Sequence, residues 1–152
     1  MEVSLAREPV RGPGIRALLE QSWALSDSLY PADSNHHLDE DALDQPGIAF
    51  FVARRDGAAL GCGALKRVDE IYGEMKSVFV DPAVRGLGIA RALVATIEAE
   101  ARTQGLSLIR LETGTRQPEA IGLYEATGFR RILPFGDYRD DPLSLFMEKT
   151  LS

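Results

Sequence analysis

A glycine-rich turn between a strand and a helix constrains this chain more than any other segment. The run 75–80 is rich in β-forming residues, the turn occupies residues 81–89, and an apolar helical run begins at Ala90. This order lets backbone N–H groups and the positive end of a helix converge on a phosphate. At Gly86 and Gly88 a side chain would hold an anion away from those amides. The segment therefore predicts a binding site for a phosphorylated cofactor.

The spacing of the glycines separates the candidate cofactors. A dinucleotide fingerprint needs a third glycine where this chain has Arg91, and the Gly-Lys-Ser/Thr ending of a Walker loop is missing from the sequence. The pattern that fits is Arg85-x-x-Gly88-x-Ala90. It resembles the pyrophosphate-binding motif Arg/Gln-x-x-Gly-x-Gly/Ala of the GNAT family of N-acetyltransferases.

A second segment carries the same resemblance. The run 124–129, with sequence YEATGF, is similar to the Tyr-Glu-x-x-Gly-Phe motif that ends a short helix in this family. The likeness extends from about Phe50 to Leu151 and is looser over the first 45 residues. It implies acetyl-CoA as the co-substrate, no metal, and direct transfer of the acetyl group to a primary amine, with a small molecule as the leading acceptor.

Composition and charge narrow the setting. With 152 residues the chain is expected to form one domain, residues 1–152. No run approaches the ~20 apolar residues that cross a bilayer, and the single Cys62 cannot form an internal disulfide. A cytoplasmic protein without a membrane partner is therefore expected, with Cys62 in the core rather than acting as a nucleophile. The net charge of −6 argues against a nucleic-acid partner.

Hydrophobic periodicity predicts an α/β fold with the element order β-α-α-β-β-β-α-β-α-β-β. Strands are expected at residues 3–8, 48–54, 58–68, 72–80, 106–112, 129–133 and 143–149, and helices at residues 12–29, 38–43, 88–104 and 119–126. The strand at 106–112 is mostly apolar, as is typical of a central strand parallel to its predecessor. The GNAT resemblance likewise implies a mixed, mostly antiparallel central sheet with helices on both faces.

The family resemblance also assigns positions to the cofactor and to catalysis. The cofactor-binding positions are the end of the strand and the turn, namely Val78, Phe79, Val80, Arg85, Gly86, Leu87, Gly88, Ile89 and Ala90. Tyr124 matches the family tyrosine that lies near the coenzyme sulfur. A phenol, with an ordinary pKa of about 10, can protonate a departing thiolate at neutral pH. Tyr124 is therefore expected to be the general acid.

Glu74 is the expected base, because many family members carry a glutamate on the strand before the turn. Strict alternation along that strand would place Glu74 on one face with Val78 and Val80, and Lys76 on the same face. Glu112, at the end of the parallel strand, is a second candidate for the base and could instead orient the substrate. A strand glutamate is also commonly only solvated or paired with a lysine, and some family members use no dedicated base.

Two loops are expected to contact the acceptor. The loop after the first helix offers Tyr30, His36 and His37, and the loop between the last strands offers Tyr138 together with Phe135, Asp137 and Arg139. The adjacent histidines are not expected to bind a metal, because no Cys/His cluster accompanies them. The last strand could pair across a two-fold axis, so a homodimer is one expected assembly.

Three points stay open at the level of sequence. Some family members carry an asparagine after the parallel strand, whereas residues 112–118 here read ETGTRQP, so its contact could fall to Thr113 or Gln117 or be absent. The acceptor could instead be a protein N-terminus or a lysine side chain. The same scaffold could also serve as a non-catalytic acyl-CoA-binding module.

Overall fold

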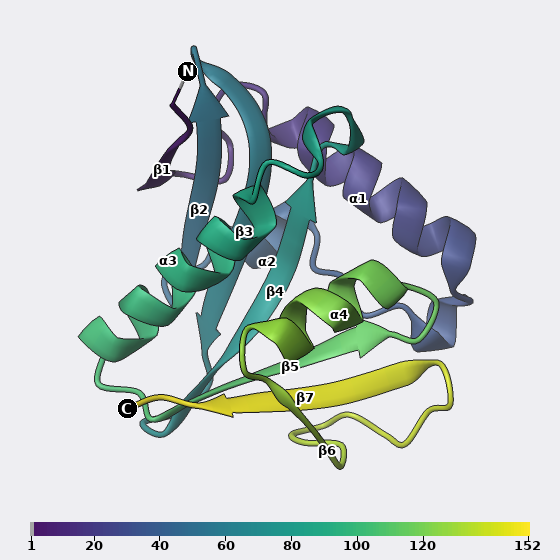
Figure 1. Ribbon diagram of the computed structural model, residues 1–152. Helices are drawn as coiled ribbons and strands as arrows, with labels where there is room; N and C mark the ends of the chain where they lie inside the picture. The colour runs from purple at the N-terminus through teal and green to yellow at the C-terminus, as the bar shows by residue number, and fades with distance from the viewer. Residues whose placement is uncertain (1) are drawn as a thin grey trace.

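The computed structural model describes residues 2–152, which form a seven-stranded sheet in the order β1-β2-β3-β4-β5-β7-β6 with four α-helices (Figure 1). The strands are β1 (Ser4–Arg7), β2 (Ile48–Arg55), β3 (Ala58–Arg67), β4 (Tyr72–Val80), β5 (Leu108–Gly114), β6 (Arg130–Ile132) and β7 (Ser144–Thr150). The helices are α1 (Ile15–Leu29), α2 (Glu40–Leu43), α3 (Ile89–Thr103) and α4 (Pro118–Ala126), with 3₁₀ turns at Ala32–Ser34 and Pro82–Val84.

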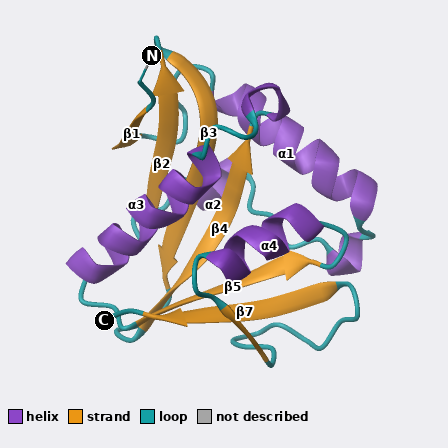
Figure 2. Cartoon of the chain, viewed as in Figure 1, coloured by secondary structure: helices purple, strands orange, loops and turns teal. Residues whose placement is uncertain are grey.

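The sheet is mixed, as predicted. Within residues 2–152 only β4 and β5 run parallel, and every other neighbouring pair is antiparallel. Helices α1 and α2 cover one face, and α3 and α4 cover the other (Figure 2). The observed order of strands and helices confirms the predicted α/β fold, including the parallel central strand β5.

Two apolar layers hold the helices on the sheet. On the α3 face, Leu93, Ile97 and Ala101 form one stripe of the helix and are fully buried. On the α1 face, Leu18 and Leu19 pack with strand residues of β2 and β3, including Cys62. Burial of a Leu or Ile side chain contributes about 1.5–3 kcal/mol. Cys62 lies in this layer, where burial raises the pKa of its thiol to about 12, as suits a core residue.

Helix boundaries differ from the predicted ones by a few residues, for local backbone reasons. The first helix was predicted from residue 12, but α1 begins at Ile15 because Gly14 adopts a left-handed conformation with φ 76° and ends the preceding turn. In α2, Asp39 accepts a hydrogen bond from the backbone N–H of Ala42 and sets the start at Glu40 rather than residue 38. Helix α3 ends at Thr103 rather than residue 104, and Gly105 just beyond it has the left-handed φ of 77° that is typical of a glycine after a helix.

A bulge in β4 overturns the expected alternation of that strand. Between the pairs Ala64↔Lys76 and Cys62↔Phe79, β4 has two residues where β3 has one, and Ser77 takes a left-handed φ of 58°. The extra residue reverses the face of the sheet to which each later side chain of β4 points. Val78 and Val80 therefore pack toward α3, whereas Glu74 and Lys76 face the α1 side. The expectation that all four share one face is wrong.

β4 and β5 separate soon after they meet. Within the described chain they pair only at Tyr72↔Leu108, Gly73↔Ile109 and Glu74↔Arg110. Beyond that point β5 stays with β7 as far as Gly114, while β4 turns away (Figure 1). The second half of β4 therefore faces an opening in the sheet rather than another strand.

Candidate active site

A cavity of about 580 Å³ lies at the C-terminal end of β4, bounded by the glycine turn and the starts of α3 and α4. We call it the turn pocket. Of the predicted cofactor-binding residues it is lined by Val78, Phe79, Val80, Arg85, Gly86, Gly88, Ile89 and Ala90. Leu87 points outward, with 58% of its surface exposed, so only its backbone belongs to the turn. The structure thus brings the predicted strand end and turn together around one cavity.

The geometry of the turn suits an anion. Gly86 and Gly88 have φ of 84° and 77°, a region that favours glycine, and no described atom lies within 4 Å of where their Cβ atoms would be. α3 begins at Ile89 after the N-cap residue Gly88, with no side-chain cap within residues 2–152 and no acidic residue in its first turn. The first amides of α3 are therefore open to a bound anion.

Charged side chains around the turn pocket favour the same type of ligand. Arg85, Arg91 and Arg116 all line the pocket. Arg85 lies 3.4 Å from Glu119 at the start of α4, and both side chains are largely exposed. Three arginines around an open helix start are a typical setting for phosphate recognition.

A smaller cavity of about 130 Å³ adjoins the turn pocket inside the opening between β4 and β5. We call it the inner cavity. The two cavities share Val78, Phe79 and Tyr124 in their walls. Tyr124 is 7% exposed, and burial, followed by the nearby charge of Glu112, raises the pKa of its phenol. Its ring packs against Phe129 of the same sequence motif, 5.7 Å between centroids. The phenol is therefore held in place and protonated at neutral pH.

Glu112 also lines the inner cavity. Burial raises the pKa of its carboxyl group, while a hydrogen bond from Ser144 and the nearby charges of His36 and Lys76 act in the opposite direction. The Ser144 hydroxyl donates to Oε2 of Glu112 at 2.8 Å. A carboxylate with a raised pKa is a suitable proton acceptor near neutral pH. The importance of Ser144 could not be seen in the sequence, because the contact spans two strands.

A third cavity, of about 550 Å³, opens on the far side of the inner cavity and is lined by Glu74 and Tyr138. We call it the acceptor pocket. It shares His36, His37 and Lys76 with the inner cavity. Glu74 is buried and accepts a hydrogen bond from the Tyr138 hydroxyl. Burial, reinforced by the charge of Glu74, raises the pKa of Tyr138.

Lys76 connects the walls of the acceptor pocket, a role that the sequence does not predict. Its ammonium donates to the His36 carbonyl at 3.1 Å and to the Tyr138 hydroxyl at 3.0 Å, and it lies 3.3 Å from Oε2 of Glu74. These contacts account for its three N–H donors. The position of Lys76 two residues after Glu74 on one strand was the available signal.

Tyr30, predicted to contact substrate, lines the inner cavity and also holds the start of α4. Its hydroxyl accepts a hydrogen bond from the backbone N–H of Arg116 at 3.1 Å and donates to Oε1 of Gln117 at 3.2 Å. A Cβ built on Gly114 would lie 1.7 Å from the same hydroxyl oxygen. Gln117 could take the place of the asparagine that some family members carry. It contacts the C-terminal end of α1 through Tyr30.

The two histidines occupy different settings on the loop after α1. The His36 ring packs edge-on against Tyr138, 5.1 Å between centroids. His37 stacks on Trp23 at 6.0 Å and lies 3.3 Å from Asp27. Among residues 2–152 no group of three His, Cys, Asp or Glu side chains could hold a metal ion. In the same range, no helix has the length and apolar character required to cross a membrane.

Comparison with known proteins identifies the family. Residues 14–129 match the family model described as the acetyltransferase (GNAT) family. A protein of Azospirillum brasilense named IAA acetyltransferase is 49% identical over 150 residues, which cover 98% of each chain.

Solved structures agree as well. A Klebsiella pneumoniae protein assigned to the acyl-CoA N-acyltransferases superposes with a TM-score of 0.83 at 33% identity, covering 99% of this chain and 98% of the other. The PaiA N-acetyltransferase of Thermoplasma acidophilum, solved with coenzyme A, has a TM-score of 0.76 at 15% identity, covering 99% of this chain and all of the other (100%), and shares the fold. The chain belongs to the GNAT family of acetyltransferases.

Proposed function

We propose that this protein transfers the acetyl group of acetyl-CoA directly to a primary amine on a small molecule. The observation that carries the proposal is the continuity of the three cavities. The turn pocket offers open amides for the pyrophosphate, the inner cavity holds Tyr124 and Glu112, and the acceptor pocket admits the amine. The name of the Azospirillum relative supports a small-molecule acceptor, without fixing which one.

In the proposed reaction the amine nitrogen attacks the thioester carbon, a C–N bond forms and the C–S bond breaks. The opening beside the second half of β4 gives the thioester arm access to backbone groups that can polarise its carbonyl. Tyr124, which its raised pKa keeps protonated at neutral pH, donates its proton to the departing sulfur and regains a proton from solvent before the next turnover. A carboxylate takes the proton that the amine loses.

Two carboxylates can take that proton, and the contacts support Glu112 over the expected Glu74. Glu112 shares the inner cavity with Tyr124. Glu74 lines the acceptor pocket, where Tyr138 and Lys76 already engage its Oε2. We therefore propose Glu112 as the base and Glu74 as the group that receives the ammonium of the acceptor.

The pH dependence of kcat distinguishes the two carboxylates. A base works only when deprotonated, so kcat rises with pH through the pKa of the base, which gives the acidic limb of the pH profile. Because the pKa of Glu112 is raised, this limb should lie at a higher pH than an ordinary glutamate would give. We expect Glu112→Gln to lower kcat about 100-fold and to remove the limb. Glu74→Gln should keep the limb and raise KM for the amine. The reverse pattern in steady-state kinetics would return the role of base to Glu74.

Calorimetric titration with acetyl-CoA tests the function itself, with NAD as the control ligand. We expect acetyl-CoA to bind and NAD not to bind, because the turn lacks the third glycine of a dinucleotide site. Release of free thiol on addition of amines would then establish turnover. If acetyl-CoA fails to bind, the proposed function is wrong. Binding without turnover of any amine would support the non-catalytic module.

A small acceptor is favoured over a protein segment because both loops that flank the acceptor pocket are tied to Lys76. We also propose that residues 1–152 act as a single domain in the cytoplasm and that two chains can associate. Size-exclusion chromatography with light scattering tests the last point.

A further inference from the structure

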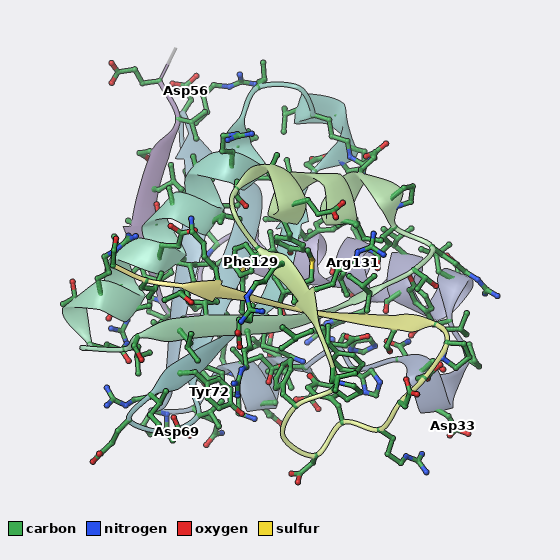
Figure 3. The ribbon with its side chains drawn as sticks, turned by 60° about the horizontal axis from the view of Figure 1, so that its bottom comes forward. Asp33, Asp56, Asp69, Tyr72, Phe129 and Arg131 are labelled. Carbon is green, nitrogen blue, oxygen red and sulfur yellow. The ribbon has the colours of Figure 1, made fainter. Side chains whose placement is uncertain are left out.

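The acceptor pocket has a wall of aromatic side chains. We define this aromatic wall as Tyr72, Phe135, Tyr138 and His36, all of which line the pocket. Phe135 lies 6.0 Å from Tyr72 and 5.2 Å from Tyr138 between ring centroids, with the rings of each pair steeply inclined. Figure 3 shows this face, with Tyr72 and Asp33 on opposite sides of the β6–β7 loop.

Contacts behind the wall hold it in place. The guanidinium of Arg110 lies over the Tyr72 ring at 4.5 Å and near the Phe135 ring at 5.8 Å. Buried Glu148 fixes that guanidinium, with Oε1 accepting from Nε at 3.0 Å. Phe146 packs behind Phe135 at 5.8 Å. A wall built in this way is ordered before a ligand arrives, which reduces the entropy lost on binding.

The wall leads toward the reacting groups. Its two members nearest the inner cavity are Tyr138, which donates to Glu74, and His36, which lines both cavities. Lys76 has its three donors occupied at this junction, so its charge is already balanced. Glu112 lies beyond it in the inner cavity. A ring seated on the wall would therefore direct a short amine-bearing arm toward two carboxylates.

We propose that the acceptor is a primary amine joined to an aromatic ring by a short linker. The half-buried rings of Tyr138 and His36 present surface to the pocket, and the buried rings of Tyr72 and Phe135 pack behind them. Contacts with such rings favour an aromatic body over an aliphatic one of similar length. This inference rests on the proposed acetyl transfer and adds the class of acceptor to it.

Charges at the rim define two forms of this acceptor. Lys66 lies opposite Glu74 in the register of β3 and β4 and lines the pocket. Arg139 of the β6–β7 loop lines it as well. Among residues 2–152 neither has an ion-pair partner within 4.0 Å, and the same holds for Asp137 and Asp140. An aromatic amino acid would offer its carboxylate to Lys66 or Arg139, whereas an arylalkylamine would not. Both share the ring and the amine, and the experiment separates them.

The test compares three amines at saturating acetyl-CoA, with release of free thiol as the readout. Phenethylamine and hexylamine have the same amine and similar length but differ in the ring, and phenylalanine adds a carboxylate to the first. We expect kcat/KM for phenethylamine or phenylalanine to exceed that for hexylamine about 10-fold. Phe135→Leu should reduce this ratio to about two, since it removes a ring from the wall. Leu133→Ala, an exposed change on the same loop outside the pocket, should preserve the ratio.

Each outcome has one meaning. A higher kcat/KM for phenylalanine identifies an aromatic amino acid, and a higher value for phenethylamine identifies an arylalkylamine. Equal or better turnover of hexylamine overturns the inference while leaving acetyl transfer intact. Turnover of none of the three, with acetyl-CoA still bound in the calorimeter, also overturns it. Failure to bind acetyl-CoA instead overturns the proposed function on which the inference rests.

Discussion

Tyr124→Phe is expected to lower kcat for acetyl transfer by about 100- to 1,000-fold while acetyl-CoA still binds. The variant keeps the ring that packs against Phe129 and removes only the hydroxyl in the inner cavity. Without that proton the departing thiolate must be protonated from elsewhere, and the loss falls on kcat rather than on affinity. Steady-state thiol release and calorimetric titration of the same preparation measure the two quantities.

Thr103→Val is the control for this prediction. It removes a hydroxyl from the exposed C-terminal end of α3, outside all three cavities. We expect its kcat to stay within about threefold of the parent value, far from the range of an acid catalyst. If Tyr124→Phe also stays within that range, Tyr124 is a packing residue and the sulfur obtains its proton from another source.

Gly114→Ala is expected to destabilise the fold by about 3 kcal/mol, at the upper end of the usual cost of overpacking. The new methyl group would lie 1.7 Å from the hydroxyl oxygen and 1.9 Å from Cζ of Tyr30. Relief of this overlap requires Tyr30 to move, which breaks its hydrogen bonds with Arg116 and Gln117. Urea unfolding measures the loss, and activity should fall with it because these bonds hold the start of α4.

The cost should depend on Tyr30. In a double-mutant cycle, Gly114→Ala should cost at least about 2 kcal/mol less in a Tyr30→Ala background, where the overlapping atoms are gone. Gly122→Ala serves as the control within α4, since no described atom lies within 4 Å of its added Cβ. That change should stabilise the helix by up to about 1 kcal/mol. Additive costs in the cycle would mean that Gly114 is required for a reason other than Tyr30.

The order of elements and the turn pocket could be predicted because both depend on local sequence. Glycine spacing at 86 and 88 determines the turn conformation, and the apolar stripe of α3 follows from helical periodicity. The motif containing Tyr124 placed that residue beside the same opening. These signals lie within a few residues of the features they predict.

The rest of the site depends on contacts that local sequence does not encode. A serine gives no sign that it will adopt φ 58°, so the bulge at Ser77 and the reversed facing of Val78 were hidden. Tyr30 meets Gln117 across 87 positions of the chain. Lys76 gained its role from two loops that fold over it. Glu74 and Tyr124 were predicted as one catalytic pair, yet they line different cavities.

Because β4 and β5 pair over only a short ladder, the sheet consists of two lobes that few residue pairs connect. Strands β1–β4 form one lobe and β5, β7 and β6 the other, with three residue pairs between them. An extended ligand arm in the opening would act as a surrogate strand and join the lobes along the rest of β4. Substrate would then complete the architecture of the protein as well as react in it, and resistance to unfolding would increase with the logarithm of its concentration above Kd.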